Sequence, residues 1–245
     1  MKRPGRLLGR WLVLVLTAAL ALQVFFIGRI ALMAVVDPQS TTFERSEAWR
    51  LARAGPLRWR QQWRDDGQIS EHLKRAVVAA EDDGFASHEG VDWEAIERAW
   101  VRNARLREAA EGDAGPRQPA RPIRLHGGST ITQQLAKNLL LSGERSLLRK
   151  GQELVLAYAL ERLLDKRRIL TLYLNHVEWG TGVFGAEAAA QHYFSKSAAE
   201  LSAWEAARLA VMLPRPRYFE QRPQSAYLQG RTRAIVRRMR ATQLP

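Results

Sequence analysis

One carboxylate draws attention because it ends the apolar face of a predicted helix. Leu73, Val77 and Glu81 share one i, i+4 row, which directs Glu81 toward a core. A carboxylate in that position must be paired, or desolvation raises its pKa. The alternative is an ordinary helix C-terminus with a solvated acidic turn, in which His88 satisfies a carboxylate. A negative charge at a helix C-terminus interacts unfavourably with the helix dipole and so destabilises the helix. The position of Glu81 therefore favours a chemical role over a structural one.

Residues 127–138 are the most informative run about function: Gly-Gly-Ser-Thr-Ile-Thr-Gln-Gln-Leu-Ala-Lys-Asn. Glycines, hydroxyls, amides and a lysine lie here between helical segments. Ser129 is predicted to cap a helix that begins at Thr130. The pair Gly127 and Gly128 would let the backbone approach a ligand closely. Amides and hydroxyls in the first turn of a helix form an anion site, so this run is a candidate phosphate site.

The helix that follows carries side chains suited to phosphates and sugars. Gln133 and Lys137 share one face, and Gln134 and Asn138 share the neighbouring face. The lysine supplies a point charge for phosphate, and the amides suit sugar hydroxyls. A nucleotide P-loop is excluded because no Lys-[Ser/Thr] follows the last glycine. The alternative is a capped polar helix at the surface.

A second carboxylate, Glu153, follows Arg149 and Lys150 and precedes a stretch, Leu154–Leu160, that is apolar on nearly all sides. Such a helix is expected to be buried, so Glu153 would border the interior. A purely structural salt-bridge cluster is the alternative. The next basic run, 166–168, is predicted to be a solvated turn.

Together, two carboxylates, an anion-binding helix start and added cations suggest one reaction. A phosphate leaving group would be displaced from a lipid-linked substrate, with a carboxylate as the base.

The elements that must position these residues are predicted to be helical. Ser70 caps a helix whose face includes Leu73, Ala76, Val77 and Ala80. Residues 104–126 are expected to form a long polar loop, because Gly112, Gly115 and three prolines interrupt the periodicity. Further helices are expected from about Thr130, over Leu147–Leu164, from Arg168 to about Val177, and from a Ser197–Glu200 capping box to Leu213–Pro214. No strand-type alternation is visible, so the fold class is mainly α.

A membrane anchor is predicted near the N-terminus. Trp11–Ile27 carries no formal charge, is flanked by Arg10 and Arg29, and would span about 26 Å as a helix. The basic tail before it favours a cytoplasmic N-terminus, with everything after the span outside. A signal peptide cleaved near Ala19–Ala21 is the alternative, but that site lies inside the apolar run.

Composition bounds the rest of the interpretation. The 245 residues suit one domain plus an anchor, and the net charge of +13 favours anionic partners without choosing among lipid, pyrophosphate and nucleic acid. No cysteine is present, which excludes disulfides and thiolate chemistry. Trp49, Trp59 and Trp63 lie among arginines in 37–69, which suits either a juxtamembrane collar or a connector with core tryptophans.

The ordered motifs resemble those of the peptidoglycan glycosyltransferases, over about residues 65–220. The similar segments are Glu81-Asp82-x-x-Phe85-x-x-His88-x-Gly90; Gly128-Ser-Thr-x-Thr-Gln-Gln-Leu-x-Lys137-Asn138; Arg149-Lys150-x-x-Glu153 with Ile169-Leu-x-x-Tyr173-Leu-Asn175 and Gly180; Gly185-Ala186, Tyr193-Phe194 and Lys196; and Leu213-Pro214 with Pro216. Thr171, where an acidic residue is common, is a minor departure.

The resemblance implies a lysozyme-like helical fold that polymerises lipid II into β-1,4-linked glycan strands outside the cytoplasmic membrane. It implies that Glu81 is the general base and that Glu153 positions substrate or assists at the leaving group. Lys137, Arg149 and Lys150 would neutralise the pyrophosphate. The remaining substrate-binding residues would be Ser129, Thr130, Gln133, Gln134 and Asn138.

The same resemblance implies partners and an organisation of the chain. Lipid II, the growing glycan strand and membrane lipid are the expected partners, together with cell-division or elongation proteins, and nucleic acid is not. No cofactor is required; a divalent cation (Mg or Mn) assists some members, but no metal-ligand spacing is visible, so no metal residue is assigned. We expect a tail over 1–10, an anchor over 11–29, a juxtamembrane segment over 30–69 and a monofunctional glycosyltransferase domain over 70–245.

Two rival functions belong to other classes. A lysozyme-like hydrolase or lytic transglycosylase also uses an acidic residue at a helix end, but its sugar leaving group has no need for the cations of 128–150. A membrane scaffold without enzymatic activity would tolerate replacement of Glu81.

Overall fold

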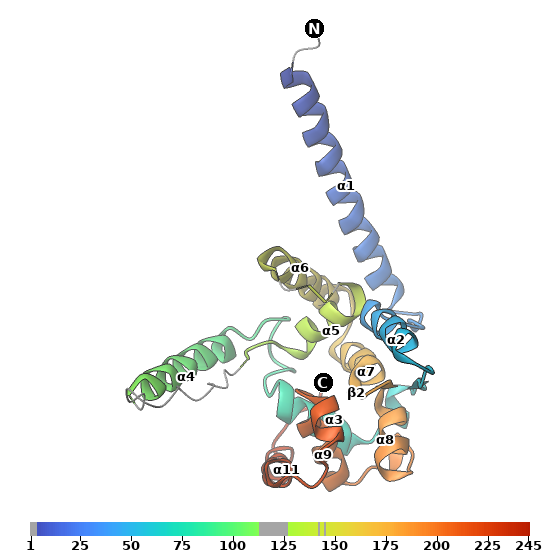
Figure 1. Ribbon diagram of the computed structural model, residues 1–245, viewed down its shortest axis with the longest axis vertical. Coiled ribbons are helices and arrows are strands. Elements are labelled where there is room, and N and C mark those ends of the chain that lie inside the picture. Colours follow the sequence, from blue (N-terminus) through green and yellow to red (C-terminus); the bar gives the residue numbers. More distant parts are fainter. Residues whose placement is uncertain (1–3, 113–126, 142, 145) are drawn as a thin grey trace.

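The computed structural model describes residues 4–112, 127–141, 143–144 and 146–245. A long helix, α1 (Pro4–Leu32), extends from a helical domain that contains most of the remaining chain (Figure 1). Its segment Leu7–Leu32 has a mean hydropathy of 2.3 and is almost entirely exposed. By length and composition, α1 fits a single-pass membrane anchor.

Polar contacts attach the end of α1 to the domain. The Arg168 guanidinium donates to the carbonyl oxygens of Met33 (2.7 Å) and Val36 (3.2 Å), and it pairs with Asp37 at 2.7 Å. The amides of Gln23 and Gln152 also bond to each other, at 2.8 and 2.9 Å. The prediction of a solvated basic turn over 166–168 is therefore wrong, because Arg168 binds the unpaired carbonyls at a helix C-terminus.

The chain after α1 folds back onto the domain. A capping box of Thr41 and Glu44 begins α2 (Thr42–Ala54), which packs against α5 (Ile131–Leu140). Trp59 stacks on Phe184 with ring centroids 4.5 Å apart, and Trp63 packs against the core. For these two residues, the interpretation as core tryptophans of a connector is confirmed.

A small sheet was not predicted from the sequence. Strand β1 (Arg60–Gln61) pairs in parallel with β3 (Val183–Phe184), which pairs antiparallel with β2 (Glu178–Gly180). The mainly α fold class holds, and the sheet adds only seven residues to it. Strands of two or three residues are too short to show an alternating pattern.

Two groups of helices form the domain, which is predominantly α as predicted. α3 (Glu71–Glu81) packs on α9 (Ala203–Met212), and both contact α11 (Ala226–Arg238). α5 packs on α6 (Leu147–Leu163) and α7 (Lys166–His176). The smaller helical elements are η1 (Asp66–Gln68), α8 (Ala186–Phe194), η2 (Ala198–Glu200) and α10 (Pro216–Glu220).

The predicted caps are partly confirmed. Ser70 accepts a hydrogen bond from the His72 amide at the start of α3, and Leu73, Ala76 and Val77 are buried as expected. The Ser197–Glu200 capping box exists, but it opens only η2. α9 begins later, at a second capping box formed by Ser202 and Glu205, because two caps follow each other in this segment.

Two other expectations about helices are wrong. The predicted loop over 104–126 is helical as far as Gly112, because α4 (Trp93–Gly112) continues through strong helix formers such as Leu106, Glu108 and alanines; residues 113–126 lie outside the described part. α6 is not buried all round: Val155 and Tyr158 are more than half exposed, and so are Leu147 and Leu148 at its start. Only one face of α6 enters the core.

Candidate active site

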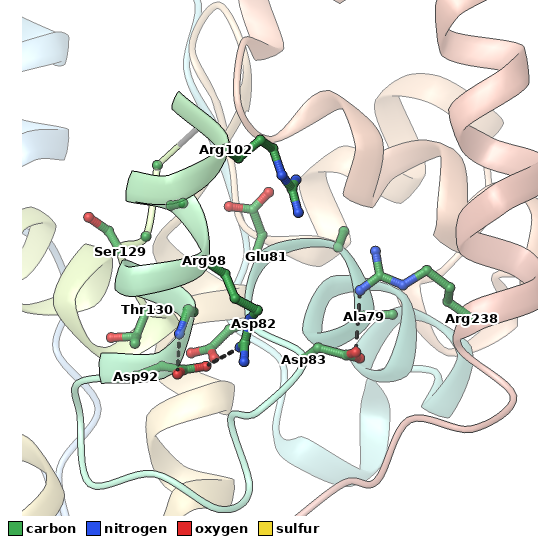
Figure 2. Close-up of a pocket in the computed structure, with 15 residues that line it drawn as sticks. Ala79, Glu81, Asp82, Asp83, Asp92, Arg98, Arg102, Ser129, Thr130 and Arg238 are labelled. Carbon is green, nitrogen blue, oxygen red and sulfur yellow. Dashed lines mark hydrogen bonds and ion pairs between the residues drawn. The ribbon is translucent and has the colours of Figure 1, made fainter. Parts of the chain in front are cut away.

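Glu81 is the last residue of α3 and lines a cleft between α3, α4 and residues 127–130 (Figure 2). Its Oε2 accepts a hydrogen bond from Gln134 Nε2 on α5 at 3.0 Å, and the Tyr173 hydroxyl donates to Gln134 Oε1 at 3.0 Å. The buried phenol stays protonated, since burial raises its pKa well above the ordinary value. Tyr173 therefore fixes the Gln134 amide with its nitrogen toward Glu81.

Burial raises the pKa of Glu81 above its ordinary value of 4.5. The Gln134 hydrogen bond opposes this rise, and the negative charge of Asp82 adds to it. A carboxylate with a raised pKa in a cleft is a better proton acceptor than an exposed one.

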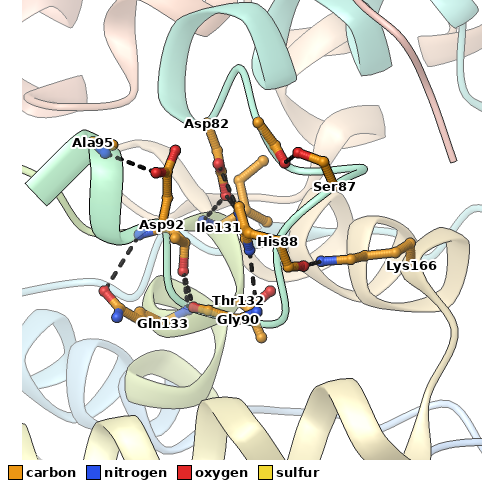
Figure 3. A network of polar contacts seen from close by, with 12 residues as sticks. Asp82, Ser87, His88, Gly90, Asp92, Ala95, Ile131, Thr132, Gln133 and Lys166 are labelled. Atoms are coloured by element: carbon orange, nitrogen blue, oxygen red, sulfur yellow. Dashed lines mark hydrogen bonds and ion pairs between the residues drawn. The ribbon is translucent and has the colours of Figure 1, made fainter.

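Asp82 and His88 hold the turn after Glu81 in place (Figure 3). Asp82 accepts hydrogen bonds from His88 Nε2 at 2.9 Å and from the Ile131 amide at 2.9 Å. His88 Nδ1 accepts from the Gly90 amide at 3.1 Å, so Nε2 carries the proton. His88 thus satisfies a carboxylate, as the alternative for this turn proposed, but that carboxylate is Asp82. The network joins the turn to the start of α5 and leaves Glu81 free for the cleft.

The start of α5 differs from the prediction by one residue. Thr130, not Ser129, is the N-cap: its hydroxyl accepts from the Gln133 amide at 3.1 Å, and Gln133 Oε1 accepts from the Thr130 amide at 3.3 Å. The buried Gln133 therefore shapes the helix start. A Cβ on Gly128 would lie 3.0 Å from the Cα of Ile96, so this glycine lets α4 approach closely. Gly127 and Gly128 both line the cleft, and close approach of a ligand to them stays a prediction.

The second predicted carboxylate lies in a cluster of cations on α5 and α6. Glu153 is 3 % exposed, accepts from Arg149 Nη1 at 2.9 Å and pairs through its other oxygen with Lys150 Nζ. The Lys137 side chain reaches solvent, yet surrounding protein desolvates its ammonium and lowers its pKa. Glu153 opposes that shift, whereas Arg149 and Lys150 add to it.

Ser129 lies between the cleft of Glu81 and the cations around Glu153. It lines the cleft of Glu81, and its hydroxyl accepts from Lys150 Nζ at 3.4 Å. Thr130 also lines the cleft, while Asn138 is buried on α5. The folded chain thus brings a basic carboxylate and a cation cluster to neighbouring positions.

Three arginines of the cleft were missed by the sequence analysis. Arg98 and Arg102 project from α4, and Arg238 comes from α11 (Figure 2). Arg98 contacts Asp92 at 3.6 Å and Glu94 at 3.1 Å, whereas Arg102 has no ion pair within the described ranges. The i, i+4 spacing of Arg98 and Arg102 is a signal that could have placed them on one helical face.

Comparison with known proteins assigns the family. The profile of the transglycosylase family matches residues 51–240, and three relatives are each described as a biosynthetic peptidoglycan transglycosylase. The Paraburkholderia phytofirmans protein is 48 % identical, with 100 % of this chain and 97 % of the relative covered. Those of Burkholderia thailandensis (50 %; 93 % and 84 % covered) and Bordetella pertussis (49 %; 94 % and 91 % covered) are similarly related.

The chain belongs to the transglycosylase family. This confirms the resemblance, the lysozyme-like helical fold and the prediction of an enzyme, a peptidoglycan glycosyltransferase that polymerises glycan strands in cell-wall synthesis.

The transglycosylase shows no group of three or more His, Asp or Glu side chains suited to a metal ion within its described residues. Assistance by a divalent cation stays a prediction.

Proposed function

We propose that this transglycosylase polymerises lipid II and releases undecaprenyl pyrophosphate. The 4-hydroxyl of the acceptor sugar would attack the anomeric carbon of the lipid-linked growing chain. The bond to the pyrophosphate would break as the new one forms, inverting α to β and giving a linear β-1,4 strand. The observation that carries the proposal is the desolvated carboxylate of Glu81 beside the cations of α5 and α6, with Ser129 between them.

Glu81 would be the general base of this reaction. Its raised pKa suits it to take the proton of a sugar hydroxyl, because proton transfer is most efficient when the pKa lies near the working pH. Gln134 would hold the carboxylate in position through its hydrogen bond. The attacking oxygen would gain negative charge as its proton moves to Glu81.

The cations would stabilise the leaving pyrophosphate. Lys137, Arg149 and Lys150 gather around Glu153, and Arg149 Nε is buried without a hydrogen-bond partner in the described chain. A phosphate oxygen could satisfy that donor, and charge-assisted bonds of this kind are stronger than neutral ones. Since both oxygens of Glu153 contact cations, Glu153 would position them rather than attack a substrate atom.

The remaining predicted residues would divide into two roles. Ser129 and Gln134 present polar groups toward the cleft or its carboxylate, so they would contact sugar or phosphate. Thr130, Gln133 and Asn138 would support the start and the body of α5, which carries Lys137.

For location, we propose that α1 crosses the cytoplasmic (inner) membrane once, with the basic tail in the cytoplasm and the domain on the periplasmic side. The exposed apolar side chains of α6, at Leu147, Leu148, Val155 and Tyr158, support contact of the domain with lipid. The Gln23–Gln152 pair places this helix alongside the anchor. The division into tail (1–10), anchor (11–29), juxtamembrane segment (30–69) and catalytic domain (70–245) belongs to the same proposal.

Incubation of the purified full-length protein with detergent-solubilised lipid II tests this function. We expect a polymer that separates by gel electrophoresis and that lysozyme degrades. A hydrolase would instead shorten preformed glycan strands, and a scaffold would leave lipid II unchanged. Either result would contradict the proposal.

A further inference from the structure

Arg238, the last residue of α11, lies in the cleft although it belongs to none of the motifs described above. Its Nη2 lies 3.3 Å from Oδ2 of Asp83, two residues after Glu81. The two side chains are 45 % and 60 % exposed. An ion pair this open to solvent contributes little to stability, so holding α11 in place is a weak explanation for it.

The Asp83–Arg238 pair stands between two hollows. Both residues line the cleft of Glu81, and both also line a second hollow of about 310 Å³. The other residues of the second hollow are small or uncharged: Gly84, Ala86, Ser87, Ala241, Thr242 and Gln243. The charged residues of the second hollow are therefore Arg238 and Asp83, which already pair with each other, and the rest of its lining leaves space beside them.

The position of the pair indicates which part of a substrate would reach it. In Figure 2, Glu81 lies between Ser129 on one side and Arg238 on the other. Ser129 contacts Lys150 of the cluster proposed to hold the leaving pyrophosphate. Arg238 therefore flanks the opposite side, from which the acceptor would approach.

The location of α11 favours a peptide over a lipid phosphate as the ligand. α11 lies at the end of the domain away from the anchor helix α1 (Figure 1). A diphosphate that is bonded to a membrane lipid is held near the membrane. The peptide of lipid II, in contrast, extends from the sugar and carries free carboxylates.

We infer that Arg238 is a specificity-determining residue that binds a carboxylate of the acceptor's peptide. Asp83 competes with that carboxylate for the guanidinium and is released to solvent when the acceptor binds. The peptide then occupies the second hollow. This inference rests on the proposed function, because it requires lipid II as the acceptor.

The competition predicts opposite effects for the two partners. Arg238→Gln should raise the KM for lipid II about fivefold, the factor that corresponds to an exposed ion pair of about 1 kcal/mol. Asp83→Asn should lower the KM, since it removes the competitor, and kcat should change little in both variants. Arg237→Gln is the matched control: it removes the same charge from the exposed neighbour of Arg238, and its KM should equal that of the wild type.

A purely structural pair would give a different pattern. If the pair only held α11 to the turn after α3, both substitutions would shift the KM in the same direction or not at all. Either outcome would overturn the inference. A wild-type protein that makes no polymer from lipid II would instead defeat the proposed function, so the two failures are distinguishable.

A second substrate identifies the anion. With lipid II whose peptide carboxylates are amidated, the wild type should show the raised KM of Arg238→Gln, and that variant should not distinguish the two substrates. If Arg238→Gln still raises the KM with amidated lipid II, the guanidinium does not act on the peptide and the assignment is overturned.

Discussion

At the scale of single residues, the two predicted carboxylates, Glu81 and Glu153, have different neighbours. Glu81 is desolvated and touches one neutral donor, the Gln134 amide. Glu153 is buried as well, but two cations contact it. The same side-chain type therefore lies in two different surroundings, a neutral one at Glu81 and a cationic one at Glu153, which supports the two roles proposed for them.

The first prediction concerns the loss of the base. Glu81→Gln keeps the size of the side chain but replaces the carboxylate by a neutral amide that does not take up a proton, so polymerisation of lipid II should fall by about 100-fold or more. Folding should not suffer. Since the folded pKa lies above the ordinary 4.5, the ionised form disfavours the folded state above about pH 4.5, and the neutral amide removes that cost.

Gel-based polymerisation and thermal unfolding check this prediction together. Glu71→Gln, on the exposed side of the same helix, is the control and should keep full activity. A Glu81→Gln variant that polymerises lipid II at a tenth of the wild-type rate or faster would remove Glu81 from the role of base.

The second prediction concerns pH. Gln134 donates to the ionised carboxylate and so opposes the rise of the Glu81 pKa. Gln134→Ala should raise that pKa further and move the acidic limb of the kcat/KM profile to higher pH, because Glu81 must be ionised to accept a proton. Tyr173→Phe, which only releases the Gln134 amide, should give a smaller shift in the same direction. An acidic limb that stays in place in both variants would contradict this account.

The sequence predicts those site residues whose position follows from local spacing. It does not predict residues that reach the site from a distant segment of the chain. The i, i+4 row of Leu73, Val77 and Glu81 placed Glu81 correctly at the end of a buried helix face. Arg238 enters the cleft of Glu81 because α11 packs against α3, and no local sequence pattern predicts that packing.

At the scale of elements, helix ends set the geometry of the cleft. The Asp82 carboxylate accepts from the first amide of α5, which ties the end of α3 to the start of the helix that carries Gln134 and Lys137. A backbone amide at a helix N-terminus has no partner within its own helix, so it favours a carboxylate. Glu81, the proposed base, and Lys137, a proposed pyrophosphate ligand, are thereby carried by two helices that are joined end to end.

The third prediction tests the junction between the anchor and the domain. Arg168→Gln removes the ion pair with Asp37 and the guanidinium that binds two carbonyl oxygens after α1. We expect a loss of about 1–2 kcal/mol and a fall in Tm of about 2–6 °C. Thermal unfolding of the full-length protein in detergent measures it, with Arg167→Gln, at a largely exposed neighbour, as the control. Equal Tm values for the two variants would show that the junction does not depend on Arg168.

Helices could be predicted where the sequence contains a clear cap or a clear apolar periodicity. The cap at Ser70 and the helix over 147–163 were found, whereas the C-terminal part of α4 was predicted to be a loop because this polar part lacks an apolar stripe. The sheet was missed because β1 and β3 each contribute only two residues and are far apart in sequence.

At the scale of the whole molecule, exposed apolar side chains of α1 and of α6 lie on neighbouring helices. The exposed part of α1 continues beside α6, whose outward side carries Leu147, Leu148, Val155 and Tyr158. An apolar surface beside a membrane helix is suited to lipid, and lipid II is itself embedded in lipid.

The last prediction uses this surface to separate membrane contact from chemistry. Replacing Leu147 and Leu148 together by Gln leaves the cleft of Glu81 untouched, since neither residue lines it and both are almost fully exposed. In detergent micelles the double variant should polymerise lipid II at the wild-type rate. In vesicles that contain lipid II its rate should fall severalfold, because the two leucines no longer hold the domain against the lipid, while α1 still keeps the protein in the membrane. The pair Val35 and Val36, exposed just after α1, provides the matched control when both are replaced by Thr. If the double variant of Leu147 and Leu148 is equally active in micelles and vesicles, α6 does not enter the lipid, and α1 alone holds the enzyme at the membrane.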